Sequence, residues 1–509
     1  MGEPLDIVIL GGGTAGWMAA TALVTFLPSS RCRVRLVESE EIGIVGVGEA
    51  TLPQMKNFND AIGVNEAEMM RATKGAFKLG IEFVDWGTKG SRYIHPFGAH
   101  GTADTAHVFH HRWVRALRSG WESDIQEYSF AVQAARMRRF NFPSTDQAAI
   151  ESTFSYAYHF DASLYSVFLR GLAQQRGVIR TEGKVREIVR DPQSGDVRSL
   201  TLESGESITG DLFIDCSGFR SLLLDKTLGV AWEDWSKWLP CDRAFAVPSE
   251  RGEFTPFTRS TAMEAGWRWR IPLQHRTGNG YVCSSSFIKE DDAAASLLRS
   301  LDAKPLAEPR MLRFQAGRRV VSWEKNCVAI GLASGFLEPL ESTSIYLIQV
   351  AVLQLLPLLP MKRIDPRLRD EFNRLIDMEY ERIRDFLILH YKLNTRDDAE
   401  IWRYCAAMEV PDSLNHKIEI FRHSGIIKRY HGLFSPPSWL SVFVGQGLVP
   451  EGYSRLADIE PEDDMIAGLD ALRTMIRDKV GQMPSHDDFI ADYCAPEAPL
   501  AAVAEEVRP

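Results

Sequence analysis

The first forty residues alternate between apolar and glycine-rich stretches in the order strand, loop, helix, strand. Ile7 to Leu10 is a short apolar run, and Thr14 to Phe26 repeats apolar residues at helical spacing. "CRVRLVE", Cys32 to Glu38, alternates as a strand does. This pattern predicts a βαβ unit and places the chain in the α/β class.

Later segments predict a mixed fold. Short alternating runs punctuated by Ser194-Gly195 and Ser204-Gly205 predict an antiparallel ribbon that returns to the parallel sheet through the apolar strand Leu212 to Ile214. "GWRWRIP" and "GYVCSSSFI" predict further strands, and long helical patterns dominate after about Ile345. We therefore expect a Rossmann-like domain with an inserted β-sheet layer over residues 1–345, a helical C-terminal domain over 346–495 and a flexible tail over 496–509.

The stretch "KGAFKLGIEFVDW" poses a question about its polar positions. Phe77, Leu79, Ile81 and Phe83 fall on one face of a strand, and Lys78, Gly80 and Glu82 fall on the other. Read alone, this alternation predicts a half-buried strand whose lysine lies on a solvated face. The alternative is that the polar face borders a site and that Gly80 leaves room beside Lys78.

Composition and charge exclude several classes of protein. The chain has 509 residues, of which 45% are hydrophobic and 25% charged, as in soluble globular proteins. A net charge of -10 argues against a nucleic-acid partner. Seven cysteines without a C-x-x-C pair indicate a reducing compartment, without disulfides and without a metal site.

Neither the N-terminus nor the most apolar run of the chain suggests a membrane. The N-terminus carries Glu3 and Asp6 where a signal peptide would carry basic residues. The most apolar run, Ile345 to Pro360, contains Gln349 and Gln354 and is broken by Pro357, so it predicts a buried helix. We expect a cytoplasmic protein that does not bind membranes.

The strongest chemical motif is a G-x-G-x-x-G sequence at the first strand–helix junction. Gly11 permits a tight turn, Gly13 lets the backbone approach a pyrophosphate, and Gly16 lets helix and strand pack closely. Glu38 ends the second strand about 20 residues later, where an acid binds a ribose hydroxyl. The motif predicts a dinucleotide site, the alternative being a glycine-rich turn of an unrelated α/β protein.

The dinucleotide is expected to be FAD. "DLFIDCSG" is an apolar strand of the kind that lies beside the nucleotide in FAD-binding folds, and "NCVAIGLASG" resembles the segment that closes over the flavin in flavin monooxygenases. A second G-x-G-x-x-G at a strand–helix junction is missing, so reduced flavin must come from elsewhere. The predicted cofactor-binding residues are Gly11, Gly13, Thr14, Ala15, Gly16, Glu38, Glu49, Ala50, Gly331 and Leu332.

Five segments together resemble one family. Together, "GGGTAGW", "GVGEATLP" (residues 46–53), "FKLGIEF", "GWRWRIP" and "FLEPLESTS" resemble segments of flavin-dependent halogenases of the tryptophan halogenase family. The resemblance runs from residue 5 to about residue 460. It implies that reduced FAD, O2 and a chloride or bromide ion give hypohalous acid, which crosses a tunnel to a lysine and then halogenates an electron-rich aromatic, often an indole.

The resemblance assigns two catalytic residues, Lys78 and Glu341. An ammonium at Lys78 would hydrogen-bond hypohalous acid and make it more electrophilic, whereas a neutral amine would form a haloamine. Glu341, in "LEST", would stabilise the cationic ring intermediate or accept its proton. Without the resemblance, Glu341 reads as a first-turn carboxylate that favours the dipole of the following helix.

The resemblance also assigns a halide site and a wall beside the flavin. Thr343 and Ser344 stand just before the predicted helix, where free backbone N–H groups bind anions. The family commonly has glycine where this chain has Ser344, and serine resists some of the backbone angles open to glycine. Trp267 and Trp269 share a strand face and, with Ile271 and Pro272, would keep substrate away from the flavin; the simpler interpretation is a core aromatic stripe.

Substrate contacts are expected at His95, Phe97 and Trp439. His95 and Phe97, in "HPFG", match a segment that flanks the substrate ring, although His95 also suits a structural role. Tryptophan-specific members hold the amino-acid end of their substrate with a tyrosine pair, and this chain has Trp439 and Leu440 there. A simple indole or another electron-rich aromatic is therefore at least as suitable as free tryptophan.

Two other functions remain open from the sequence. A flavin monooxygenase that hydroxylates an aromatic would share the FAD site but would need neither Lys78 nor halide. A non-catalytic flavin-binding protein with a helical interaction domain would bind FAD without oxygen-dependent product. The halogenase interpretation implies a separate NAD(P)H flavin reductase as partner, and a homodimer is a reasonable expectation.

Overall fold

The N-terminal strand–helix–strand unit forms the centre of a six-stranded sheet. The computed structural model describes residues 3–41, 48–103, 108–428, 430 and 432–495. The predicted helix (α1, Thr14–Phe26) and second strand (β2, Cys32–Glu38) have the expected bounds, and the first strand (β1) begins two residues earlier than predicted. The order of this sheet is β20 (Trp323–Glu324), β21 (Cys327–Ala329), β12 (Leu212–Asp215), β1 (Leu5–Leu10), β2 and β8 (Ile179–Glu182).

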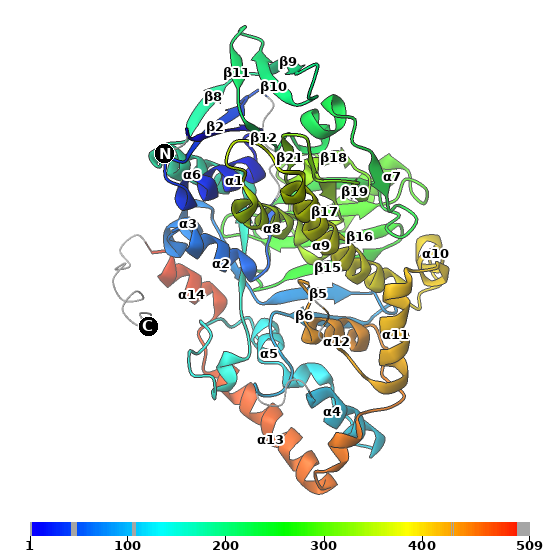
Figure 1. Cartoon of the computed structure of the whole chain (residues 1–509). Coiled ribbons are helices and arrows are strands. Elements are labelled where there is room, and N and C mark those ends of the chain that lie inside the picture. The colour runs from blue at the N-terminus through cyan, green and yellow to red at the C-terminus, as the bar shows by residue number, and fades with distance from the viewer. Residues whose placement is uncertain (1–2, 42–47, 104–107, 429, 431, 496–509) are drawn as a thin grey trace.

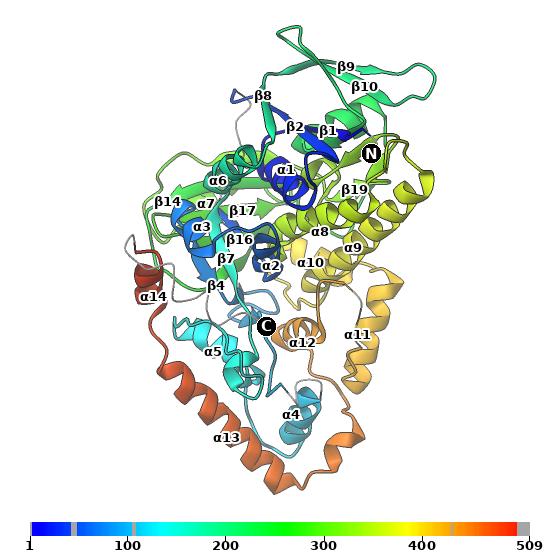
Figure 2. The same ribbon diagram turned by 60° about the vertical axis from the view of Figure 1, so that its left-hand side comes forward.

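Pairing in this sheet is parallel except at its β20 edge. β1 pairs with β2 in the register Ile7↔Val34 and with β12 in the register Ile7↔Leu212, so the predicted return of the chain through β12 is confirmed. The antiparallel ribbon that precedes β12 projects from one end of the molecule (Figure 2). It consists of β9 (Val185–Arg190), β10 (Val197–Leu202) and β11 (Ser207–Thr209).

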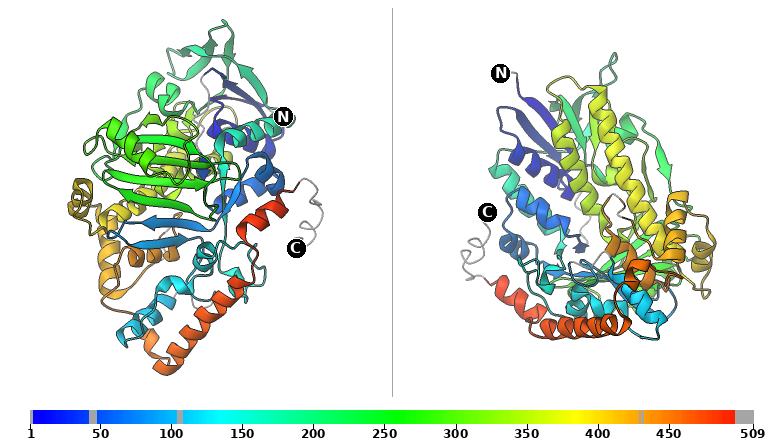
Figure 3. Two further views of the ribbon diagram at one scale, coloured as in Figure 1. Left: turned by 180° about the vertical axis from the view of Figure 1, so that it is seen from behind. Right: turned by 60° about the horizontal axis from the view of Figure 1, so that its bottom comes forward.

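A seven-stranded sheet forms the second layer. It is antiparallel except where β15 pairs in parallel with β5, and β5 and β6 lie at its lower edge in Figure 3 (left). All seven residues of β16 are buried, which fits a strand covered on both faces. The order is β18 (Arg310–Arg313), β14 (Arg243–Ser249), β17 (Thr277–Cys283), β16 (Gly266–Pro272), β15 (Thr258–Met263), β5 (Gly80–Val84) and β6 (Arg92–Pro96).

The stretch around Lys78 is two strands in different sheets. β4 (Ala76–Lys78) pairs with β7 (Ala157–Asp161), which also pairs with β3 (Gly48–Ala50). At Leu79 the chain leaves this small sheet, because the Leu79 N–H donates to Pro256 O and its carbonyl accepts from Phe97, and it then enters the seven-stranded sheet as β5. Lys78 is fully buried, so the prediction of a solvated polar face is wrong.

The expectation that Gly80 leaves room beside Lys78 is also wrong. A Cβ at Gly80 would lie 2.5 Å from His95 O and 3.0 Å from the Pro96 Cα. The glycine therefore lets β5 and β6 approach closely, which sets the position of His95.

Helices cover the sheets and make up most of the chain after residue 343. α8 (Thr343–Leu358) packs against both α1 and α9 (Pro366–Lys392), and the two long helices cross the centre of Figure 1. α8 ends one residue after Pro357 and is largely buried, as predicted. The other late helices are α10 (Glu400–Ala407), α11 (Asp412–Ser424), α12 (Pro436–Gly445), α13 (Glu462–Gly481) and α14 (His486–Tyr493).

The remaining elements connect these layers. The division of domains between residues 345 and 346 falls in the first turn of α8 and stays a prediction; the tail, 496–509, lies outside the described residues. No helix in the described part of the chain is long and apolar enough to cross a membrane. The remaining longer helices and the third small sheet are α2 (Gln54–Ala61), α3 (Glu66–Ala72), α4 (Phe109–Arg118), α5 (Phe130–Arg136), α6 (Ala162–Gln175), α7 (Glu290–Arg299), β13 (Trp232–Asp234), β19 (Gly317–Arg319) and β22 (Gly335–Phe336).

An aromatic cluster fastens the last helix behind the strand that carries Lys78. Phe77 stacks on Phe140 at 4.2 Å, and its ring meets Phe489 and Tyr493 of α14 at 5.7 and 5.6 Å. The Tyr493 hydroxyl donates to Glu66 Oε2, 3.0 Å away. The C-terminal helix therefore contributes to the packing that holds β4 in place.

Removing one ring of this cluster should destabilise the whole chain. We expect Phe489→Ala to lower the free energy of unfolding by about 2 kcal/mol, less than a fully buried aromatic, because Phe489 is partly exposed. Phe26→Ala, at a side chain 43% exposed, is the control and should change it by less than about 0.5 kcal/mol. Urea unfolding of both variants measures the difference, and equal effects would contradict the role of the cluster.

Candidate functional site

The glycine loop has the geometry that a pyrophosphate requires. Gly11 has φ +116°, and a Cβ there would lie 2.2 Å from Cys216 O of the neighbouring strand end. A Cβ at Gly16 would lie 1.9 Å from Gly11 O, whereas a Cβ at Gly13 would meet nothing within 4 Å. Gly13 is the N-cap of α1 and supplies no capping side chain. The open space at Gly13 faces the free N–H groups of the first helical turn, where phosphate binds.

Glu38 lies against this loop. Its Oε1 accepts from Arg180 Nε at 2.5 Å, and its Oε2 lies 3.3 Å from Trp17 Nε1. A Cβ at Gly12 would lie only 1.4 Å from Glu38 Oε2, so the glycine lets the carboxylate approach. Glu38 therefore stands at the carboxyl end of β2, beside the loop, as a ribose-binding acid does.

Other residues predicted to bind FAD converge on the same helix end. Gly331, with φ +72°, would place a Cβ 3.1 Å from the Ala15 Cβ, and Leu332 follows it in a short 3₁₀ turn. Thr14 Oγ1 lies 3.1 Å from Ser166 Oγ of α6. These residues fit a flavin dinucleotide.

Glu49 and Ala50 belong to β3, between the glycine loop and Lys78 in sequence. Burial raises the pKa of Glu49 to about 7. Gly46 and Val47, which begin the "GVGEATLP" motif, lie outside the described residues. Because β3 and β4 both pair with β7, the small sheet joins this segment to Lys78.

Lys78 is the last residue of β4 and is enclosed by protein. Its Nζ donates to Thr51 O at 2.9 Å and to Ser342 Oγ at 2.8 Å, and lies 5.0 Å from the centre of the Phe97 ring. Burial lowers the pKa of Lys78 to about 7, against the opposing effect of the Glu341 charge. The amine therefore changes its protonation state near neutral pH, whereas an exposed lysine stays protonated there.

Glu341 lies between two histidines. His95 Nδ1 is 2.9 Å from Glu341 Oε2, and His390 Nε2 is 2.8 Å from Oε1. Burial alone would raise the pKa of Glu341, but the charges and hydrogen bonds of His95 and His390 outweigh it and lower the pKa to about 2. Glu341 is thus a buried carboxylate that stays ionised across the working pH range.

His390 was not predicted from the sequence. It lies on α9, and its Nδ1 is 2.9 Å from Phe386 O, which fixes Nδ1 as the protonated nitrogen. Its other nitrogen, Nε2, faces the Glu341 carboxylate. The available signal was a single histidine in the apolar run "FLILHY" of a predicted helix, since a buried histidine needs a partner.

The segment predicted to bind halide caps α8. Thr343 and Ser344 are the first two residues of the helix instead of preceding it, and Ser342 is the N-cap, with φ +59°. Ser344 has no positive φ, so replacing glycine by serine there causes no backbone strain. Thr343 Oγ1 is buried and has no hydrogen-bond partner among the described residues. A buried hydroxyl at a helix N-terminus suits an anion.

The two predicted wall tryptophans are neighbours in β16. Their ring centres are 6.2 Å apart, and both are buried. Trp269 lies over Gly280 of β17, where a Cβ would be 2.0 Å from its ring, and Trp267 Nε1 donates to Glu338 Oε2 at 2.9 Å. Ile271, near the Pro272 end of the strand, would contact a side chain at Gly48, so β16 borders the segment that leads to Lys78.

Aromatic side chains lie around His95 on the other side. The His95 ring lies 5.7 Å from Phe386 and 6.3 Å from Phe434, and these two phenylalanines stack at 3.7 Å. Trp439 of α12 meets Phe386 at 5.0 Å and is therefore one ring removed from His95.

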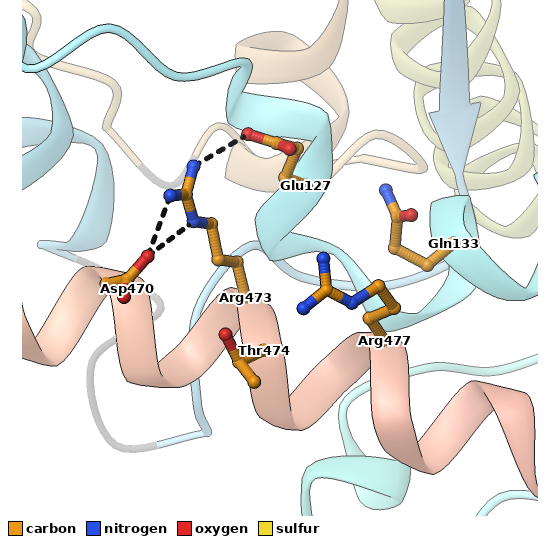
Figure 4. A pocket seen from close by; sticks show the side chains of 6 residues that line it. All are labelled: Glu127, Gln133, Asp470, Arg473, Thr474 and Arg477. Atoms are coloured by element: carbon orange, nitrogen blue, oxygen red, sulfur yellow. Dashed lines mark hydrogen bonds and ion pairs between the residues drawn. The ribbon is translucent and has the colours of Figure 1, made fainter.

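A separate polar cavity of about 430 Å³ lies between α13 and α5 (Figure 4). Arg473 is paired there with Asp470 at 2.7 Å and with Glu127 at 3.7 Å. The cavity is lined by Glu127, Gln133, Asp470, Arg473, Thr474 and Arg477, none of which was predicted as a site residue. Because Arg473 is already paired with two carboxylates there, the candidate site remains the cluster of Lys78 and Glu341.

Several known proteins similar to this chain are halogenases. The family model described as tryptophan halogenase matches residues 6–462. The chain is 35% identical to tryptophan 6-halogenase SttH of Streptomyces toxytricini over 96% of this chain and 98% of that protein. Among solved structures, BrvH, a flavin-dependent halogenase from Brevundimonas sp. BAL3, has 43% identity and a TM-score of 0.93, covering 97% of this chain and all (100%) of that one. A flavin-dependent halogenase from Xanthomonas campestris has 45% identity and a TM-score of 0.93, covering 98% and 100%.

The expected fold and family are thereby confirmed. The match extends over the glycine loop, the seven-stranded sheet and most of the late helices, and it includes every segment on which the resemblance rested. With its FAD-type loop and its halogenase relatives, the chain belongs to the tryptophan halogenase family of flavin-dependent halogenases.

Proposed function

We propose that this enzyme halogenates an electron-rich aromatic with an electrophilic halogen held at Lys78. The observation that carries the proposal is a fully buried lysine, hydrogen-bonded to Thr51 O and Ser342 Oγ, beside the ionised Glu341. A structural lysine is rarely buried in this way, because desolvation of the amine is costly unless the site uses it.

The residues of the chain divide the reaction between them. Bound reduced FAD would activate O2, which is the oxidant that converts the halide ion to hypohalous acid. Lys78 holds the hypohalous acid and polarises its O–X bond. The aromatic carbon bonds to the halogen as the O–X bond breaks, the hydroxide that leaves takes a proton from the Lys78 ammonium to give water, and the ring loses a proton. Glu341, as an anion of low pKa, stabilises the positive ring first and accepts its proton second.

The N-terminus of α8 would hold the halide. Thr343 offers an unpartnered buried hydroxyl there, and the first-turn N–H groups carry the positive end of the helix dipole. Trp267, Trp269, Ile271 and Pro272 would separate the flavin from the aromatic substrate, so that only a small oxidant passes.

The substrate would be a simple indole or another electron-rich aromatic. His95 and Phe97 would flank its ring, with Trp439 in the second row, while Leu440 cannot donate a hydrogen bond to an amino-acid group. A separate NAD(P)H flavin reductase would supply the reduced FAD. The homodimer stays a prediction.

Removing the amine should abolish halogenation. We expect Lys78→Met, which keeps chain length without charge, to lower product formation at least about 10³-fold. The assay contains FAD, a flavin reductase with NADH, chloride or bromide, and indole, with product identified by mass. Lys89→Met, at an exposed lysine, should keep full activity. Full activity of Lys78→Met would exclude the proposed role, and a hydroxylated product independent of halide would indicate a monooxygenase.

The lowered pKa of Lys78 should also make the free energy of unfolding depend on pH. Between pH about 7 and 10.5 the unfolded chain binds a proton at Lys78 that the folded chain does not, so the stability of the wild type rises with pH in this window. The stability of Lys78→Met relative to wild type should therefore be greatest below pH 7 and should shrink by about 1.4 kcal/mol per pH unit above it. Urea unfolding at pH 6.5, 7.5 and 8.5 (about one pH unit apart) measures it; a constant difference would show that the pKa is not depressed.

The Thr343 hydroxyl should affect binding of the halide and not binding of the aromatic substrate. We expect Thr343→Val to raise the apparent KM for chloride about tenfold, as loss of one hydrogen bond to an ion does, with little change in the KM for indole. Thr21→Val is the control, because the Thr21 hydroxyl bonds Trp17 O within α1. An unchanged chloride KM in Thr343→Val would place the halide elsewhere.

A further inference from the structure

A second buried carboxylate lies three residues before Glu341. Glu338 is fully buried, and its Oε2 accepts from two side chains of distant elements: Trp267 Nε1 of β16, at 2.9 Å, and the Tyr391 hydroxyl of α9, at 2.5 Å. A carboxylate taken out of water in this way is costly unless both donors reach it, so the geometry is demanding. Glu338 has no part in the chemistry proposed above.

The two carboxylates contact consecutive residues of α9. Glu341 contacts His390, and Glu338 contacts Tyr391, the next residue of the same helix. The short segment from Glu338 to Glu341 thus presents two acids, and each acid contacts a different one of two consecutive α9 residues. One acid faces the Lys78 side, and the other faces the tryptophan wall.

The indole of Trp267 is buried and meets two other indole rings. Its ring meets Trp269 at 6.2 Å and Trp86 at 6.4 Å, both in tilted geometry, and such contacts tolerate rotation of a ring. A hydrogen bond from Nε1 to a fixed carboxylate specifies one rotamer. Tyr391 fixes the carboxylate in turn, and its own ring packs against Trp86 at 5.3 Å.

We propose that Glu338 is a positioning residue that holds the Trp267 indole in the wall between the flavin and the aromatic site. This inference rests on the proposed function. Its consequence is a specific one: without Glu338 the wall loosens, hypohalous acid escapes before it reaches Lys78, and less halogenated product forms per flavin oxidised. Binding of the aromatic is unaffected.

The first experiment needs neither flavin nor substrate. The indole N–H resonances of the 12 tryptophans are recorded by ¹⁵N–¹H spectroscopy on the flavin-free protein, and Trp267→Phe identifies the Trp267 signal. Glu338→Leu should move that signal upfield in the proton dimension, and Glu338→Gln, which keeps an acceptor, should restore most of its position. Glu66→Gln alters another carboxylate that accepts from tyrosine hydroxyls, and it should leave the signal in place.

The second experiment measures coupling. We expect Glu338→Leu to lower the ratio of halogenated product to oxidised reduced flavin about tenfold, with the KM for indole unchanged, and Glu338→Gln to recover most of the ratio. The double variant Glu338→Leu/Trp267→Phe should lie within about twofold of Trp267→Phe alone, because both changes remove the same hydrogen bond. Glu66→Gln should keep the wild-type ratio.

The outcomes separate the two proposals. If the wild type halogenates while Glu338→Leu keeps its coupling ratio, or if the two changes add independently, the positioning role is overturned. If the Trp267 signal is unmoved in Glu338→Leu, it is overturned whatever the activity. Absence of halogenated product from the wild type would overturn the proposed function, and the tryptophan signal would still decide the role of Glu338.

Discussion

Desolvation of the Lys78 amine is the constraint on which the rest of the site depends. An amine removed from water needs acceptors at short range and a nearby anion, and these come from segments far apart in sequence: Thr51 O, Ser342 Oγ and the Glu341 carboxylate. The residue after β3 supplies the first, the N-cap of α8 supplies the second, and the residue before that N-cap supplies the third. The fold around the site can be understood as the means of bringing these groups to one amine.

The segment before α8 carries two buried carboxyl groups with different electrostatic surroundings. Glu338 and Glu341 are the same residue type three positions apart, yet the two histidines lower the pKa of Glu341 to about 2, while burial raises that of Glu338 to about 7 despite its bonds to Tyr391 and Trp267. Environments that separate the pKa values of neighbouring carboxyls assign them different work. The left-handed backbone at Ser342, φ +59°, turns the chain sharply between Glu341 and α8. Three consecutive positions therefore supply an acid, a hydrogen-bond partner of Lys78 and the first residue of the helix.

Residues whose roles are encoded in local spacing were predictable from the sequence. The glycines of the FAD loop, the shared face of Trp267 and Trp269 and the helices after residue 343 follow from periods and turns that need no tertiary information. The break at Leu79 was not predictable, because it depends on bonds to Pro256 and Phe97 and not on the alternation of its neighbours. His390 was not predicted for the same reason, since its partner Glu341 lies on another element. The prediction that Gly80 leaves room beside Lys78 was wrong because the sequence does not show that the backbone of β6 lies opposite this glycine.

Under the proposed mechanism, the seven free cysteines affect how long the enzyme survives its own reaction. Hypohalous acid oxidises thiols, and thiolates react far faster than the protonated form. Burial raises the pKa of every one of the seven, and only Cys494 is partly accessible. The chain thus keeps its most oxidisable groups protonated and out of reach. Durability over many turnovers is then governed less by the cysteines themselves than by how faithfully the oxidant is confined to its path, and Cys494 is the first position at which self-inflicted damage should accumulate.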